Sequence, residues 1–261
     1  MSLFRNFRDK EPNNDPMFVG WADTPAADRR FFLRAGIGLT TAAGLFGFGA
    51  AALQRSPGGG LWDPDAVREW RGIVSAEPYA MLRTNDLGGG ARTALLSCLG
   101  KCGVAARVGA LAGQAVVVSG SLIQRGVHSM IAVDEVGDWI RADSSAKGDP
   151  ALAFPASQPL GEISLTGEIL DSKCWFGAMR PADGKAHKSC ASLCIRGGIP
   201  PAFFARDASG RGALMIMTSD GRAHGPGLLG LVADPVRVSG MVRRMGDLLM
   251  LDAPLPQIRR L

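Results

Sequence analysis

The strongest constraint on the fold of this chain is an internal repeat. The stretch LAGQAVVVSGSLIQRGVHSMIAVD at 111–134 aligns without a gap on LVADPVRVSGMVRRMGDLLMLDAP at 231–254, so each matched pair lies 120 residues apart. The identical pairs include Leu111/Leu231, Val116/Val236, Val118/Val238, Ser119/Ser239, Gly120/Gly240 and Gly126/Gly246. In each copy, alternating β-branched residues run into Ser-Gly and a later glycine turns the chain. The pattern predicts two copies of one structural unit, each containing a hairpin.

The residues upstream of each hairpin also correspond. The two opening segments, WRGIVSAEPYAML and LTGEILDSKCWFG, both carry a glycine at their third position, Gly72 and Gly167. Between the opening segment and the hairpin, each copy has an apolar run entering a turn, at 93–103 and at 213–225. We therefore predict four or five short strands in each copy. The chain contains 35 glycines and 16 prolines, which favour the turns between such strands.

Five short strands that open with a glycine-bent strand resemble an OB-like barrel. Barrels of this kind bind oligonucleotides, sugars, peptides or proteins, so the resemblance implies a fold and no particular function. We predict a mainly β protein with tandem OB-like small β-barrels at 70–150 and 151–261, preceded by a linker at 54–69 and an N-terminal signal or anchor helix.

The N-terminal helix is predicted from a run without charge. Nineteen uncharged residues, 35–53, follow an arginine-rich segment, and at 1.5 Å per residue they span about 28 Å, close to the hydrocarbon thickness of a bilayer. The residues before them, 1–34, are polar and we assign them no fold. The run predicts a membrane-inserting helix that serves as a signal or an anchor.

The segment RRFFLR, just before this run, resembles the twin-arginine (Tat) signal. Arg29, Arg30, Phe32 and Leu33 match the signal, whereas Asp28 stands where a small hydroxyl residue is commoner. The resemblance implies export of an already folded protein by the Tat machinery across the inner membrane of a bacterium. It also raises the expectation of a bound cofactor, because proteins that acquire one in the cytoplasm use this route.

Two outcomes of such export stay open. Ala50-Ala51-Ala52 offers a small-x-small cleavage site, which would release the protein into the periplasm. Without cleavage, the helix remains as an anchor, with 1–34 cytoplasmic and the rest on the periplasmic side, as the positive-inside rule requires.

The second copy contains an insertion that the first copy lacks. Gly72 and Gly120 are 48 residues apart, whereas Gly167 and Gly240 are 73 residues apart. The additional residues lie at 171–204 and begin DSKCWFGAMRPADGKAHKSCASLC. An insertion between equivalent strands is where a repeated scaffold commonly acquires its own task.

The insertion predicts a metal site. KAHKSCASLCI is typical of a helix that ends at the glycines 197–198, and it would place His187, Cys190 and Cys194 on one face. Cys174 would approach from the end of the first strand. The full spacing, C-x12-H-x2-C-x3-C, offers four ligands of the kind that zinc or an iron–sulfur cluster takes.

Other interpretations of these cysteines stay open. In an oxidising compartment Cys174 can form a disulfide with Cys190 or Cys194, or the three can be buried thiols. Cys98 and Cys102, in a strand-to-turn segment of the first copy, are expected to form a local disulfide. Five cysteines are an odd number, so at least one has no disulfide partner within the chain.

The remaining sequence features argue mainly by exclusion. We expect His128 at the surface and His224 in an exposed turn, where it could add a fifth ligand. No catalytic motif is present, which favours a non-enzymatic protein, and the absence of C-x-x-C argues against a thiol-disulfide enzyme. A net charge of +5, without interleaved basic and aromatic residues, argues against nucleic-acid binding.

These features predict an exported accessory protein. It would be tethered by its N-terminal helix or released into the periplasm, and it would hold a metal or redox centre. The centre would serve electron transfer or metal handling beside an inner-membrane redox partner. The alternative is a cofactor-free OB-like module that binds a ligand or a protein, in which the disulfides are structural.

Overall fold

The computed structural model of the protein describes residues 26–53, 59–143, 149–207 and 212–261. Most of the predicted N-terminal segment, 1–25, lies outside the described residues, as do 54–58 of the predicted linker. The chain divides into two compact units, one up to Ser56 and one from Pro57 onward.

The first unit contains the predicted N-terminal apolar helix. Helix α1 (Ala26–Leu53) begins nine residues before the uncharged run, so Arg29, Arg30, Phe32 and Leu33 lie within the helix instead of preceding it. By length and composition α1 could cross a membrane, although a signal sequence has the same properties. Its large apolar side chains are exposed within the unit.

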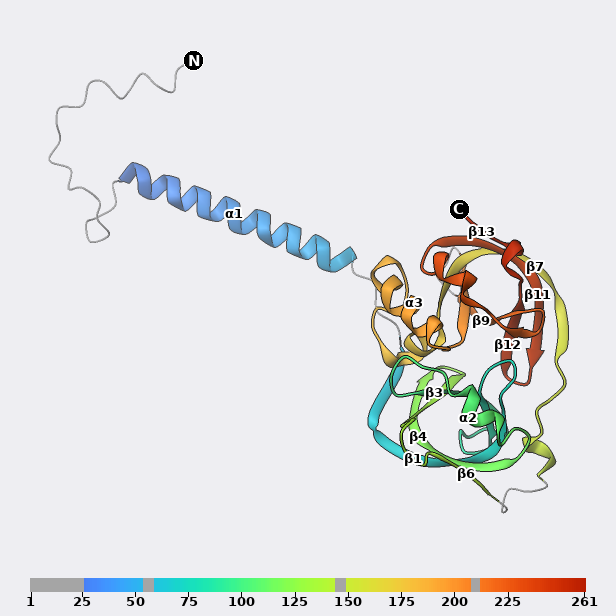
Figure 1. The fold of residues 1–261 in the computed structure, drawn as a ribbon. Helices are drawn as coiled ribbons and strands as arrows, with labels where there is room; N and C mark the ends of the chain where they lie inside the picture. The colour runs from blue at the N-terminus through green and yellow to red at the C-terminus, as the bar shows by residue number, and fades with distance from the viewer. Residues whose placement is uncertain (1–25, 54–58, 144–148, 208–211) are drawn as a thin grey trace, which may run out of the picture. The chain divides into compact units, whose positions relative to one another are not determined.

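The second unit is mainly β and consists of two small five-stranded barrels (Figure 1). The first barrel and its additions are β1 (Leu61–Ser75), β2 (Met81–Thr84), β3 (Arg92–Cys98), α2 (Ala105–Gly109), β4 (Ala115–Arg125), β5 (His128–Val133) and β6 (Ile140–Ala142). A 3-10 turn, η1 (Pro150–Leu152), leads to the second barrel.

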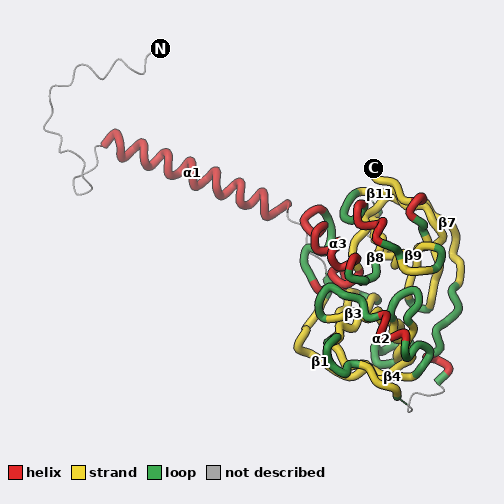
Figure 2. Tube along the Cα trace, in the orientation of Figure 1, coloured by secondary structure: helices red, strands yellow, loops and turns green. Residues whose placement is uncertain are grey.

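The second barrel consists of β7 (Gln158–Asp171), β8 (Pro201–Arg206), β9 (Gly212–Ser219), β11 (Pro235–Met245) and β12 (Leu248–Asp252). Its additions are η2 (Cys174–Ala178), η3 (Lys185–His187), α3 (Lys188–Arg196), β10 (Arg222–Ala223), η4 (Pro226–Gly230), η5 (Leu255–Gln257) and β13 (Ile258–Arg260). Figure 2 shows how little helix the two barrels contain outside α3 and a few short turns.

Both barrels have the same strand order. In the first, β1-β2-β3-β5-β4 closes through pairing of β4 with β1, and in the second β7-β8-β9-β12-β11 closes through β11 and β7. The pairs β3/β5 and β9/β12 are parallel and the other barrel pairs are antiparallel. This shared order confirms the predicted fold class of tandem OB-like barrels.

The strand register follows the sequence repeat. Strands β4 and β11 begin at residues 115 and 235, and β5 and β12 begin at 128 and 248, so both pairs keep the separation of 120. Trp70 pairs with Val118 in the first barrel, and Leu165 pairs with Val238 in the second. The two opening segments are therefore equivalent strands, as the sequence predicts.

The shared glycines allow two strands to approach closely. A Cβ atom on Gly72 would lie 2.1 Å from the carbonyl oxygen of Arg83, and one on Gly167 would lie 2.5 Å from that of Phe204. A side chain at either position would collide with the backbone of the next strand, which explains why each barrel opens with a glycine-containing strand.

Two predicted boundaries differ from the structure. Strand β1 begins at Leu61, within the predicted linker 54–69, because its polar first half pairs with β4 across a register shift between Trp62 and Val67. The insertion occupies only 172–200, between β7 and β8, because the final residues of the predicted 171–204 segment pair with β7 and β9 as strand β8.

Three apolar cores hold the second unit together. One fills the first barrel around Trp70 and Leu96, and one fills the second around Phe203 and Leu251. The third contains residues of both barrels and of the insertion, among them Met81, Met130, Phe176, Ile216 and Met250. The outer faces of the two barrels are thus buried against each other, and the barrels form one compact unit.

Candidate metal centre

The insertion starts from a buried carboxylate, Asp171, at the end of β7. Asp171 is fully buried, and its Oδ1 accepts a hydrogen bond from the backbone N–H of Cys174 at 2.8 Å. Its Oδ2 lies 2.8 Å from Nε2 of His187, which is also buried. One carboxylate therefore fixes the turn that carries Cys174 and the imidazole of His187.

Helix α3 carries the other two cysteines, as predicted. The 3-10 turn η3 leads into α3, and α3 ends at Gly197, followed by Gly198 with φ 99°. Spacings of three and four residues place His187, Cys190 and Cys194 along the same side of this helical segment. Cys194 is buried and Cys190 is half-buried.

The structure brings the predicted ligands together in two overlapping groups. The ligand atoms of Cys174, His187 and Cys190 all lie within 4.8 Å of one another, as do those of Asp171, Cys174 and Cys194. The Sγ atoms of Cys174 and Cys190 are 3.8 Å apart, and all three cysteines are free thiols. Cys194 therefore joins the cluster through Cys174, and no disulfide links Cys174 to Cys190 or Cys194 in this structure.

The sulfur atoms perturb one another's ionisation. A hydrogen bond to Cys194, together with burial, raises the pKa of the Cys174 thiol well above its ordinary value. The same bond lowers the pKa of Cys194. Cys174 thus holds its proton as a donor to Cys194, and a metal ion that binds Cys174 must displace this proton.

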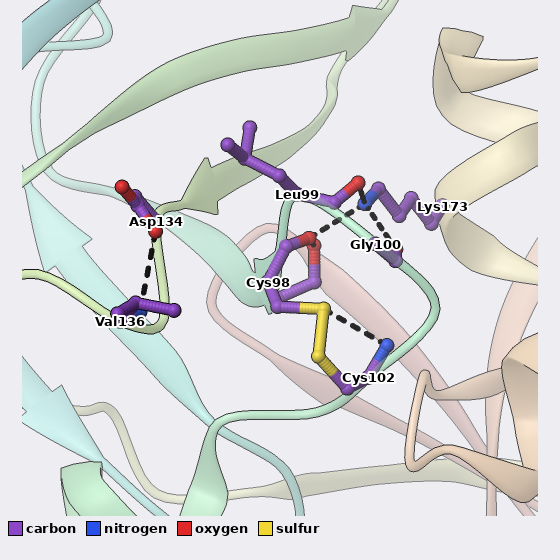
Figure 3. Close-up of a disulfide and its surroundings, with 8 residues drawn as sticks. Cys98, Leu99, Gly100, Cys102, Asp134, Val136 and Lys173 are labelled. Carbon is purple, nitrogen blue, oxygen red and sulfur yellow. Dashed lines mark hydrogen bonds between the residues drawn. A yellow bond between two sulfur atoms is a disulfide. The ribbon is translucent and has the colours of Figure 1, made fainter.

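A disulfide-closed loop of the first barrel packs beside the insertion. Cys98 and Cys102 form the predicted local disulfide, with their sulfur atoms 1.99 Å apart. The ammonium group of Lys173 donates to the carbonyl oxygens of Cys98, Leu99 and Gly100 at 2.6, 2.8 and 2.7 Å (Figure 3). Burial lowers the pKa of Lys173. The residue just before Cys174 is therefore bonded to the loop of the other barrel.

The same loop directs a lysine at the cysteine cluster. Lys101 Nζ donates to Sγ of Cys190 at 2.7 Å, and this bond raises the pKa of Lys101. The loop can approach α3 because Gly197 has no side chain: a Cβ there would lie 1.8 Å from the carbonyl oxygen of Lys101. Gly103 N–H donates to the carbonyl oxygen of Gly197 at 2.8 Å.

The other two histidines lie outside these groups. His128 is half-buried and stacks on Phe176, with ring centroids 5.4 Å apart, so it is not the surface residue that the sequence suggests. His224 is also half-buried, and its Nε2 lies 2.9 Å from the carbonyl oxygen of Ala253. Neither belongs to a Cys/His/Asp/Glu group among the described residues. A further group, Cys98, Cys102 and Glu135, has both sulfur atoms in the disulfide.

Sequence reasoning missed three residues of the site. Asp171 opens the inserted segment three positions before Cys174, and this spacing suits a side chain that accepts from the backbone of a following turn. Lys101 and Lys173 have no such local signal. Lys101 lies 89 residues from its partner Cys190, and Lys173 lies 75 residues from Cys98.

Fold and site together define a class: two OB-like barrels after an apolar N-terminal helix, with a Cys/His cluster in an insertion between the first two strands of the second barrel. No protein-family model, curated protein or solved structure matches this chain.

Proposed function

We propose that the chain is an exported bacterial accessory protein that holds one soft metal ion at Cys174, His187, Cys190 and Cys194. The protein reaches the periplasmic side of the inner membrane by the Tat machinery, and α1 is its signal or anchor. There the site takes part in metal handling beside an inner-membrane redox partner; electron transfer to that partner would require a redox-active metal in place of zinc.

The separation of two sulfur atoms carries this proposal. Two thiolates bound at about 2.3 Å to one tetrahedral zinc ion lie about 3.8 Å apart. Cys174 and Cys190 have their Sγ atoms 3.8 Å apart, whereas a disulfide requires about 2.0 Å. This pair of sulfur atoms thus already has the spacing that a single ion needs.

The surrounding residues fit a metal ion. Asp171 engages Nε2 of His187, which leaves Nδ1 as the ligand nitrogen and resembles the carboxylate–histidine pairs behind many metal sites. The Lys101 ammonium, beside Cys190, offsets the negative charge of thiolates.

A single ion is favoured over an iron–sulfur cluster. Two of the five cysteines form a disulfide, so three thiols remain, which is one fewer than a cluster held by cysteine alone requires; a cluster at this site would also need His187 as a ligand. Three cysteines and one histidine suit tetrahedral zinc.

Export is supported by two features of different kinds. The residues Arg29, Arg30, Phe32 and Leu33 resemble the Tat signal, and they belong to an apolar helix long enough to cross a membrane. The Cys98–Cys102 disulfide suits an oxidising compartment such as the periplasm. Replacing Arg29 and Arg30 by lysine should leave the protein inside the cell, as fractionation would show; normal export of that variant would refute the signal.

Metal analysis tests the centre itself. Full-length protein purified from its native compartment should contain about one metal ion per chain, and Cys174→Ser should reduce metal content at least about tenfold. Leu193→Ser is the matched control, because Leu193 is an exposed residue of the same helix α3 outside the cluster, and this variant should retain the metal. Absence of metal together with a Cys174–Cys190 disulfide in the intact protein would refute the proposal.

One cavity supports a second candidate function, in which the protein is a cofactor-free binding module. It has a volume of about 180 Å³ and is lined by residues of both barrels and of α3, including Tyr79, Val104, Ile195 and His224. A metal-free protein that binds a small apolar ligand in this cavity would support the module instead of the metal centre.

A further inference from the structure

An aromatic cluster lies where the first barrel meets the insertion. Trp175 and Phe176, next to Cys174, pack against His128 at the start of β5 and Phe204 in β8. Arg125, at the end of β4, has its Cζ 4.2 Å from the centre of the Trp175 ring. The guanidinium group of Arg125 thus lies over the Trp175 ring at cation–π distance.

This cluster contains buried donors that lack acceptors. Nε and Nη2 of Arg125 are buried and have no hydrogen-bond partner among the described residues. The same is true of Nε1 of Trp175, a residue that is only 8% exposed. A buried donor without a partner costs free energy, and a bound ion that accepts from it is one way to recover that cost.

The two unpartnered nitrogen atoms of Arg125 form one edge of its guanidinium group. The Nε–H and one Nη2–H bond point the same way, which is the geometry that holds two oxygen atoms of a carboxylate or a phosphate. This edge therefore presents two N–H donors in the arrangement that binds an oxyanion.

The charge around Arg125 also favours an anion. Arg180 and Arg206 add positive charge, and Asp183, the acidic group that opposes them, is already paired with Arg206. Arg180 donates to the carbonyl oxygen of Gly60. Burial lowers the pKa of Arg125, as expected of a cation without a counter-ion. Two further guanidinium groups and one carboxylate thus influence the Arg125 guanidinium, and positive charge is in excess.

We infer that this junction binds a small oxyanion, a carboxylate or a phosphate, through the Nε/Nη2 edge of Arg125 and the indole N–H of Trp175. The position agrees with the fold. Arg125 precedes the β4–β5 turn of the first barrel, and Trp175 lies in the insertion between the first two strands of the second. OB-like barrels use both kinds of loop to bind ligands, and here one loop comes from each barrel. The inference does not depend on metal binding.

The test follows the Trp175 indole resonance in full-length, detergent-solubilised protein labelled with ¹⁵N. Trp175→Phe assigns the resonance, and sodium acetate or sodium phosphate is titrated against sodium chloride at constant ionic strength. We expect a saturable shift with acetate or phosphate and none with chloride. A response to acetate identifies a carboxylate site and a response to phosphate a phosphate site. No saturable shift with either, or the same shift with chloride, would overturn the inference.

Two substitutions make the test specific. Arg125→Lys keeps the charge but removes the paired donors, and it should weaken binding at least about tenfold. Arg237→Lys is the control, because Arg237 is an exposed residue of β11, and it should bind like the wild type. Equal binding by Arg125→Lys would also overturn the inference. Should Arg125→Lys fail to fold, calorimetry on Trp175→Phe, which removes only the indole donor, should show weakened binding, and unchanged binding would count against the site.

Metal content separates this inference from the proposed function. Arg125→Lys should retain its metal while losing the anion, and Cys174→Ser should lose metal while still binding the anion. Loss of anion binding in Cys174→Ser with its fold intact would contradict the independence of the two sites.

Discussion

Individual side chains hold the insertion in place, and Asp171 does so through both of its carboxylate oxygens. Its two carboxylate oxygens engage the backbone of Cys174 and the ring of His187, each at 2.8 Å. A buried carboxylate is costly unless its oxygens have partners, and here both are used. Asp171 thus positions two proposed ligands.

Asp171→Asn should therefore weaken metal binding without unfolding the barrel. An amide keeps the volume but loses the charge that orients and polarises His187, so we expect affinity to fall about 10- to 100-fold. Competition with a chromophoric chelator measures this loss. Glu162→Gln, an exposed change on β7, is the control, and wild-type affinity in Asp171→Asn would contradict the role.

A second carboxylate, Asp234, holds the start of α3 and makes the stability of the folded protein depend on pH. Its side chain pairs with Lys185, Lys188 and Arg260, at 2.7 to 3.0 Å. Hydrogen bonds from the two lysines lower the pKa of Asp234 to about 2, from 3.8. Because the folded-state pKa is the lower one, this stabilisation is complete above about pH 4 and is lost as the pH falls toward 2.

The stability difference between wild type and Asp234→Asn should depend on pH over the same range, between about pH 4 and pH 2. Urea denaturation should give the wild type a higher midpoint at pH 7 and at pH 4.5, and the difference should shrink toward zero near pH 2. A difference that is unchanged at pH 2 would show that Asp234 acts through something other than its charge.

At the scale of elements, the contact between α3 and the disulfide loop joins the two barrels at the site. Lys173 donates to three carbonyl groups of the loop, and Gly197 allows the loop backbone to lie against the end of α3. The loop in turn directs Lys101 at Cys190. The cluster thus depends on the docking of two elements that are far apart in the sequence.

Gly197→Ala should destabilise the protein because its Cβ would lie 1.8 Å from the carbonyl oxygen of Lys101. The φ of Gly197 is −76°, so alanine is strained by this collision and not by its backbone conformation. We expect a loss of about 1–3 kcal/mol in the free energy of unfolding, measured by urea denaturation.

Gly225→Ala is the matched control for this substitution. Its φ is −78° and a Cβ there would meet nothing within 4 Å, so its stability should change little. Equal effects of the two substitutions would mean that the loop does not pack against α3 as described.

In the molecule as a whole, the apolar core between the barrels joins the two repeated barrels into one compact unit. Residues such as Met81 and Met130 of the first barrel share this core with Ile216 and Met250 of the second. Neither barrel can lose its partner without exposing part of this surface.

The two barrels should accordingly unfold together. Urea denaturation followed by tryptophan fluorescence and by far-ultraviolet circular dichroism should give coincident single transitions. Lys173→Met, which leaves three loop carbonyls without their buried donor, should lower the midpoint without splitting the transition. Two separate transitions in the wild type would refute the shared core.

Features that depend on local patterns can be predicted from the amino-acid sequence. Strand alternation, the separation of 120 between β4 and β11, and the helix carrying Cys190 and Cys194 all follow from periodicity within short segments. The same is true of the Cys98–Cys102 disulfide, whose cysteines are four residues apart. The polar first half of β1 was missed because the alternation is absent there.

The contacts between these segments cannot be predicted in this way and are seen only in the folded protein. The pairing of Lys101 with Cys190, the bonds of Lys173 to the loop, and the position of Arg125 on Trp175 join residues 50 to 89 positions apart. Such contacts arise because two barrel surfaces pack against each other, and this packing depends on the shape and apolar area of whole barrel faces. It produces no periodic pattern in the sequence of either contacting segment.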